Sequence, residues 1–162
     1  MSLAGCAGYR WGTRSLYRQD VRTVHVPIIE SDSLRRALGE RLTEAVVKQI
    51  ELNSAYKVVG SPEEADSILR CQIISDQKRI LAETRTDEMR ATGIALQVQV
   101  DWLDRRNQSL IQRTEMPLPS NLLTITQSKA MVAETGQSIV STQQAVIDSI
   151  AHQIVEQMEA AW

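Results

Sequence analysis

Apolar residues recur along this chain at two different spacings, one typical of helices and the other of strands. Between residues 33 and 52 every fourth position is apolar, and good N-cap residues stand at 31–33. A second stripe with helical spacing begins near Ser138 and runs nearly to Trp162. The two patterns predict two amphipathic helices, each burying one face. The stripe positions are Leu34, Leu38, Leu42, Ala45, Val46 and Ile50 in the first helix, and Ile139, Gln143, Ile147, Ile150, Ile154 and Met158 in the second.

Alternation of apolar and polar residues predicts the strands. The clearest case is Gly93–Leu103, where Trp102 and four aliphatic residues share one face. A turn at 104–107 predicts a hairpin in which Ser109–Met116 returns as the next strand. Further strands are expected at Val21–Ile29, at Tyr56–Val59 and at Ser67–Ile74 continuing toward Ala82, with a single helical turn at Pro62–Glu64 and a polar connection at Thr84–Thr92.

Residues 118–135 leave two interpretations open. Leu122–Ile125 fits either an edge strand or an apolar loop. Ala130–Glu134 could begin a helix, which Gly136 would then interrupt.

The elements follow the order strand, helix, about three strands, helix, and each has one apolar face. This order predicts an α+β fold in which two helices pack on one face of a mixed, mostly antiparallel sheet of about four strands. The opposite face of the sheet would be polar and open to solvent or to a partner. Its expected residues are Arg70, Gln72, Gln97, Gln99 and Arg113.

Composition limits the function classes that remain. With 162 residues the chain fits one domain, which we place at residues 21–162 after a tether at residues 1–20. A net charge of −2 argues against a dedicated nucleic-acid binder, because such domains are usually strongly basic. The chain has no run of 18 apolar residues, so no transmembrane helix is expected. The two histidines and two cysteines form no cluster with metal-ligand spacing, so we expect no cofactor or metal and place Cys71 in the core.

The stretch Leu3-Ala4-Gly5-Cys6 resembles the lipobox of bacterial lipoproteins. In that motif the cysteine becomes an acylated N-terminus, which holds a protein on a membrane without spanning it. The resemblance implies lipidation at Cys6, and Ala7 after it implies sorting to the outer membrane. Only Met1 and Ser2 precede the motif, so we expect the apolar part of the signal peptide to have been removed from this sequence. The alternative is a chance Leu-Ala-Gly-Cys.

Several short segments, taken in order, resemble one protein family. They are Cys6 followed by Gly8-Tyr9, the Val24–Pro27 strand, the helix Leu38–Ile50, Ala65-Asp66 leading into Ile68–Ile73, the alternating hairpin, and the closing helix at Ile150–Val155. Together they resemble the LPS-assembly lipoprotein LptE (rare lipoprotein B) family over almost the whole chain. The resemblance implies an outer-membrane lipoprotein on the periplasmic side. Such a protein binds lipopolysaccharide (LPS) and acts as plug and assembly partner of the LPS-transport β-barrel LptD.

Cationic residues are the candidate LPS contacts, because lipid A carries phosphates that arginine can bind bidentately. These candidates are Arg70, Lys78, Arg79 and Arg113.

Two other classes of protein remain as alternatives. A periplasmic lipoprotein activator of peptidoglycan synthase, related to LpoB and CsgG, shares the order of strand, helix and Ala-Asp segment, but often has a longer linker after its cysteine. An enzyme has little support, since the chain has no nucleophile elbow, phosphate-binding glycine loop, HExxH or CxxC motif. We therefore expect a non-catalytic binding protein.

Overall fold

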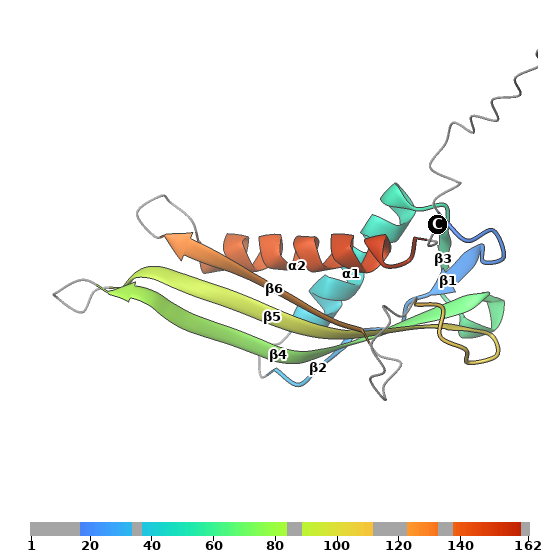
Figure 1. Cartoon of the computed structure of the whole chain (residues 1–162), viewed down its shortest axis with the longest axis horizontal. Helices are drawn as coiled ribbons and strands as arrows, with labels where there is room; N and C mark the ends of the chain where they lie inside the picture. The colour runs from blue at the N-terminus through green and yellow to red at the C-terminus, as the bar shows by residue number, and fades with distance from the viewer. Residues whose placement is uncertain (1–16, 34–36, 84–88, 112–122, 133–137, 160–162) are drawn as a thin grey trace, which may run out of the picture.

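The computed structural model describes residues 17–33, 37–83, 89–111, 123–132 and 138–159. Two helices lie on one side of a six-stranded mixed sheet, which confirms the predicted α+β architecture (Figure 1). The elements in chain order are β1 (Thr23–His25), β2 (Glu30–Ser31), α1 (Leu38–Asn53), β3 (Lys57–Val59), the 3-10 turn η2 (Pro62–Glu64), β4 (Ser67–Glu83), β5 (Met89–Asp104), β6 (Leu123–Val132) and α2 (Ile139–Glu156). None of the described helices is long and apolar enough to cross a membrane.

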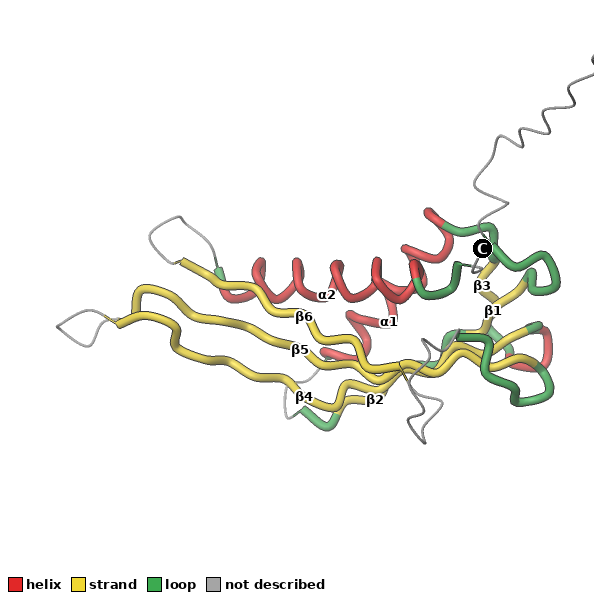
Figure 2. The backbone as a smooth tube through the Cα atoms, in the orientation of Figure 1, coloured by secondary structure: helices red, strands yellow, loops and turns green. Residues whose placement is uncertain are grey.

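The sheet has a parallel part and an antiparallel part. Its order is β3-β1-β4-β5-β6, with β2 also pairing with β4. β1 runs parallel to β3 and to the start of β4, and β2 runs parallel to β4 farther along. The strands β4, β5 and β6 form a long antiparallel meander along the molecule, while β1 and β3 lie at the end near the C-terminus (Figure 2).

The sheet has six strands rather than about four, partly because the strand expected at Val21–Ile29 is divided. Pro27 lies between β1 and β2 and has no N–H to donate to a ladder, so pairing stops there and resumes at Glu30. The predicted strand at Tyr56–Val59 and the helical turn at Pro62–Glu64 are confirmed.

The core lies between the helices and the sheet, where the predicted stripes meet. Val46 and Ile150, one from each helix, are fully buried, as are Leu69 of β4 and Val98 of β5. Trp102 is 1% exposed, which confirms its predicted place in the core. Ile139 is an exception in the second stripe, because it stands in the first turn of α2 and is 38% exposed.

The first helix begins later than predicted. Its N-cap is Ala37, with a left-handed φ of 63°, and not a residue of the Ser31–Ser33 cluster. A residue in the left-handed conformation does not continue a right-handed helix, so α1 starts after Ala37. The first turns of α1 lie close to Ile29, because a Cβ on Gly39 would collide with the Ile29 carbonyl oxygen and the Thr43 hydroxyl accepts a hydrogen bond from the Ile29 N–H at 2.9 Å. These contacts place the start of α1 directly against Ile29, the residue that precedes β2.

The strand predicted at Ser109–Met116 is wrong where it can be compared. Ser109 forms one isolated bridge with Leu103, no strand follows at 110–111, and 112–122 lie outside the described residues. β5 has one edge available beyond β4, and two segments share it. The short hairpin occupies Trp102–Asp104, while β6 pairs with residues 91–100 of β5.

β6 also resolves the two open interpretations. Leu123–Ile125 is strand rather than loop, and residues 130–132 end that strand instead of beginning a helix. The connection expected at Thr84–Thr92 is shorter than predicted, since β5 already begins at Met89.

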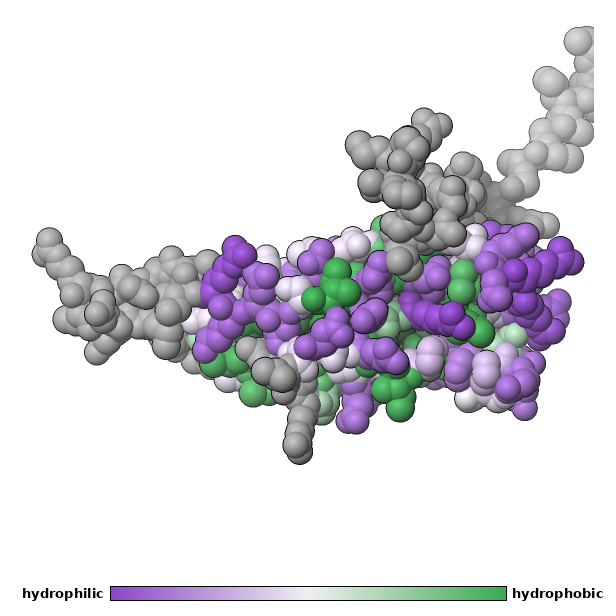
Figure 3. All heavy atoms as spheres, turned by 90° about the horizontal axis from the view of Figure 1, so that it is seen from below, coloured by the Kyte–Doolittle hydropathy of each residue, from purple (hydrophilic) through white to green (hydrophobic). Residues whose placement is uncertain are grey.

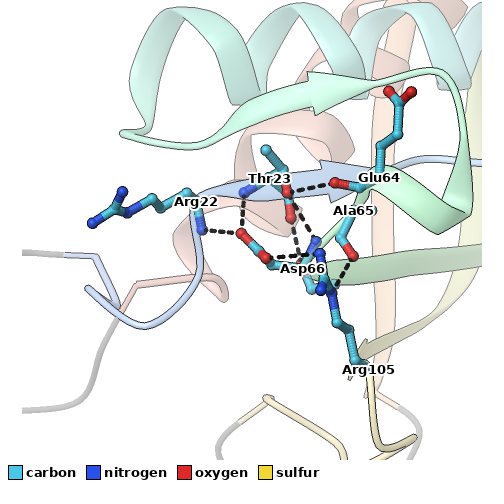
Figure 4. A network of polar contacts seen from close by, with 7 residues as sticks. Arg22, Thr23, Glu64, Ala65, Asp66 and Arg105 are labelled. Atoms are coloured by element: carbon cyan, nitrogen blue, oxygen red, sulfur yellow. Dashed lines mark hydrogen bonds and ion pairs between the residues drawn. The ribbon is translucent and has the colours of Figure 1, made fainter.

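A polar network joins the start of β1 to the start of β4 (Figure 4). Oδ2 of Asp66 accepts hydrogen bonds from the backbone N–H groups of Arg22 and Thr23, both at 3.1 Å. Nη2 of Arg105 lies 3.2 Å from Oδ1 of Asp66, and its Nε donates to the carbonyl of Ala65 at 2.8 Å. Burial raises the pKa of the Asp66 carboxyl, but the hydrogen bonds and the charge of Arg105 outweigh it and hold the pKa below 3.8.

Aromatic contacts attach the N-terminal segment to this domain. Tyr17 is buried, packs edge-on against Tyr56 at 5.4 Å between ring centroids, and forms a bridge with Glu159. Tyr56 in turn packs against Trp102 at 5.6 Å. Of the three aromatic residues through which we expect the tether to dock, Tyr17 packs against the domain, and Tyr9 and Trp11 lie outside the described residues.

Candidate functional site: the open face of the sheet

The face of the sheet away from the helices carries polar side chains in rows across the strands. One row contains Glu30 of β2, Gln72 of β4, Gln99 of β5 and Thr124 of β6, which are paired in register. Seen from this side, hydrophilic residues cover most of the surface, with small hydrophobic patches among them (Figure 3). The polar open face predicted from the sequence is therefore confirmed over the described strands.

A β-bulge in β4 reverses which of its residues face outward. Ile73 pairs with Val98, but Ser75 pairs with Gln97, so β4 has one extra residue between these pairs. Because side chains alternate along a strand, odd-numbered residues of β4 face the core up to Ile73, and those from Ser75 to Arg79 face the open side.

This reversal separates the cationic candidates. Arg70 and Arg79 lie on the open face, roughly 30 Å apart along β4 at about 3.3 Å per residue. Lys78 pairs with the fully buried Ile94 and therefore projects from the opposite side of the sheet. Arg113 lies outside the described residues. The structure therefore brings no two of the three described candidates close enough to hold one phosphate together.

A groove of about 430 Å³ opens on this face where β2, β4 and β5 meet. Its volume falls in the range typical of small-ligand sites. The residues that give it chemical character are Ile28, Glu30, Arg70, Gln72, Gln99 and Asp101.

Asp101 brings to the groove a buried oxygen, Oδ1, that has no hydrogen-bond partner among the described residues. Arg70 stands in the paired position on β4, yet no ion pair joins the two side chains in this part of the structure. Burial raises the pKa of the Asp101 carboxyl, and the charge of Arg70 offsets only part of that rise.

Comparison with known families shows which family this chain matches. The family model described as LptE, lipopolysaccharide-assembly, matches residues 21–161. The chain belongs to the LptE family. A comparison with curated proteins finds no match.

Solved structures share the fold at low sequence identity. Lipoprotein B from Nitrosomonas europaea is 17% identical, with a TM-score of 0.56 over 91% of this chain and 90% of that one. The PelC dodecamer subunit from Paraburkholderia phytofirmans is 8% identical, with a TM-score of 0.56 over 89% of this chain and 93% of that one. Protein CT253 from Chlamydia trachomatis is 10% identical, with a TM-score of 0.54 over 85% and 98%. At these identities the likeness concerns the fold alone.

Sequence analysis of this LptE-family chain found only part of the groove. Arg70, Gln72 and Gln99 were expected on the open face, but Glu30 and Asp101 were not singled out. The alternation in Gly93–Leu103 already placed Asp101 on the wet face. Its position opposite Arg70 depends on the register between β4 and β5, which no local pattern in either strand contains.

Cys71 and the histidines have structural surroundings in this LptE-family fold. Cys71, expected in the core, is half-buried and packs against the core cluster, and burial raises the pKa of its thiol to about 12. His25 contacts the carbonyl of Val59 at 3.1 Å, and His152 is exposed beside Glu156. Within the described ranges no group of His, Cys, Asp or Glu could hold a metal ion.

Proposed function

We propose that this LptE-family protein is a non-catalytic outer-membrane lipoprotein, anchored through Cys6 on the periplasmic side. It would bind LPS and act as plug and assembly partner of the LPS-transport β-barrel, a protein like LptD. The observation that carries this proposal is the match of the LptE family model along residues 21–161. Cys6 itself lies outside the described residues.

The difference between the two faces of the sheet supports a role inside a barrel. One face packs against both helices and forms a continuous core, which makes the body rigid. The other face presents glutamine, threonine and serine side chains together with charged residues of both signs. The interior of a channel-type barrel is polar and filled with water. Such a face can therefore lie against it without exposing apolar groups to water.

The N-terminal segment supports membrane attachment of the domain by its length. Tyr17, which docks in the core, follows Cys6 by eleven positions. A chain of that length spans at most about 40 Å when fully extended. An acylated Cys6 would therefore keep the end of the domain that carries β1, β3 and the C-terminus close to the membrane surface.

Arg70 and Arg79 are the described cations of the open face that we propose as LPS contacts. Both are exposed, and Arg79 is oriented by a hydrogen bond from its Nη2 to Oε1 of Gln77 at 2.8 Å. Their separation along β4 means that each would contact a different part of the ligand.

The test is co-purification from outer membranes in mild detergent, after expression with a complete lipoprotein signal peptide placed before Cys6. We expect mass spectrometry to find an acylated Cys6 and a large β-barrel protein in the same complex, together with bound LPS. A Cys6→Ser variant is the matched control and should leave the membrane fraction.

Two outcomes would contradict the proposal. An acylated cysteine without a barrel partner would favour a peptidoglycan-synthase activator instead. A wild-type protein without acylation at Cys6 would remove the lipid anchor.

A further inference from the structure

We propose that the groove between β2, β4 and β5 is a sugar-binding site that recognises the hydroxyl groups of a glycan through Asp101, Gln72 and Gln99. The groove, including Arg70, would then bind the saccharide part of a glycolipid and not its phosphates, which replaces the phosphate contact expected for Arg70 from the sequence. This inference rests on the proposed function for the choice of glycan, and it deepens that function by naming the part of the ligand that is bound.

The mixture of hydrogen-bonding groups in the groove suits hydroxyl groups. Gln72 and Gln99 pair directly across β4 and β5, and each amide offers both donors and an acceptor. Arg70 adds donors beside them, and Asp101 adds acceptors. A hydroxyl group both donates and accepts, so neighbouring hydroxyls on a sugar ring can use both kinds of partner at once.

Charge in the groove argues against a phosphate. Arg70 is its one cation among the described lining residues, whereas Glu30 and Asp101 are both acidic. Neither carboxylate forms an ion pair with a described residue, and Arg70 alone offsets part of the negative charge of Asp101. Asp32 adds a third carboxylate, 3.5 Å from Nε2 of Gln72. A phosphate placed here would meet more negative than positive charge.

Asp101 is the group that gains most from a ligand. Asp101 lines the groove while its Oδ1 is buried and unpaired among the described residues, so a hydrogen bond donated to the carboxylate from the groove would offset part of its desolvation cost. A neutral sugar hydroxyl can donate such a bond without adding charge, whereas phosphate would place further negative charge beside the carboxylate. Sites built around a hydroxyl partner discriminate strongly against ligands that lack it.

The rim of the groove supplies an apolar surface as well. Ile28 stands beside Pro27 and is 73% exposed, the highest value among the large hydrophobic residues of the described chain. The C–H face of a sugar ring could cover this side chain while the hydroxyls reach the polar residues.

The experiment is isothermal titration calorimetry of the full chain with core oligosaccharide that has been released from LPS by mild acid and then dephosphorylated. We expect saturable binding to the wild type. Asp101→Asn and Gln99→Ala should each weaken it by about tenfold or more, the loss expected for one hydrogen bond to a charged or well-buried group. Inorganic phosphate should not compete.

Gln97→Ala is the matched control, because Gln97 lies on the same face of β5, two residues from Gln99, and does not line the groove. It should bind the oligosaccharide as the wild type does. Thermal unfolding of each variant separates loss of binding from loss of folding, and Gln99→Ala keeps the test valid if Asp101→Asn unfolds.

The outcomes separate this inference from the proposed function. Binding of intact LPS without binding of the oligosaccharide, or displacement of the oligosaccharide by phosphate, overturns the sugar site and leaves the proposed function standing. Equal weakening by Gln97→Ala also overturns it. Absence of binding to either ligand overturns the sugar site and the LPS-binding role together.

Discussion

At the scale of single residues, Asp66 has a set of partners that no sequence pattern indicates. Its carboxylate accepts two backbone N–H groups from the start of β1 and faces Arg105 from the turn after β5. Three segments far apart in the sequence therefore meet at one side chain (Figure 4). The Ala65-Asp66 pair entered the family resemblance as a motif, and the structure gives it a mechanical role in fixing where β4 begins.

Asp66→Asn should lower the free energy of unfolding by about 1 to 2 kcal/mol at pH 7, because an amide cannot replace a charged acceptor of two N–H bonds. The pKa of Asp66 is lower in the folded chain than its ordinary value of 3.8. The contribution of the carboxylate is therefore fully present above about pH 4 and is lost as the pH falls through the lower, folded-state pKa. Urea unfolding of both proteins at pH 7 and at pH 3 measures this.

The control for Asp66 is Asp148→Asn, which makes the same change at an exposed site on α2. Its effect should stay within about 0.5 kcal/mol. Identical unfolding curves for Asp66→Asn and the wild type at pH 7 would show that the network contributes no stability.

At the scale of elements, the first turn of α1 packs closely against a residue outside the helix, Ile29. A glycine inside a helix usually costs about 1 kcal/mol relative to alanine. Gly39→Ala should nevertheless destabilise the protein by about 1 to 3 kcal/mol, since the new Cβ would collide with the carbonyl oxygen of Ile29. Thermal or urea unfolding of the purified variant measures whether its free energy of unfolding falls.

Gly60→Ala is the companion variant, because a Cβ at Gly60 meets no atom within 4 Å. It should change the stability by no more than about 0.5 kcal/mol. If Gly39→Ala proved as stable as Gly60→Ala, the close approach of α1 to Ile29 would be wrong.

The bulge in β4 is a second feature of an element that local pattern did not predict. Residues 67–73 alternate regularly, and the sequence predicts that the strand continues toward Ala82, long or bent, but assigns no faces to that continuation. The structure confirms the length of this strand. After Ile73 the odd-numbered residues up to Arg79 change from the core side to the open side. An extra residue in one strand is defined only relative to its partner strand, so β4 alone does not contain the information.

At the scale of the whole molecule, the sheet has one face for stability and one for contact. Leu96→Ala should cost about 2 to 5 kcal/mol, because Leu96 is completely buried beneath the helices. Its neighbour Gln97 points to the open side, so Gln97→Ala should change the stability by less than about 0.5 kcal/mol. The free energies of unfolding in urea compare the two, and equal losses would contradict the assignment of faces.

The candidate site was predictable only as a kind of surface. The alternation in β5 and the polar residues of β4 placed Gln72, Gln97, Gln99 and Arg70 on an open face, and the structure agrees. The groove itself depends on register and on the path of the chain around Pro27, which brings Glu30 beside Gln72. Both are long-range relations between segments, and neither leaves a local signal.

The sequence by itself determined the type and order of most elements, because periodicity reports which side of a helix or strand is apolar. It determined both helices, the core position of Trp102 and the polar character of one sheet face. Only the tertiary structure decided that β6 pairs with β5 and that Asp101 is paired with Arg70. It also decided that Lys78 lies on the side of the sheet opposite the open face. The reason is that pairing and register are relations between strands distant in the chain, and a shift of one residue moves every side chain to the other face.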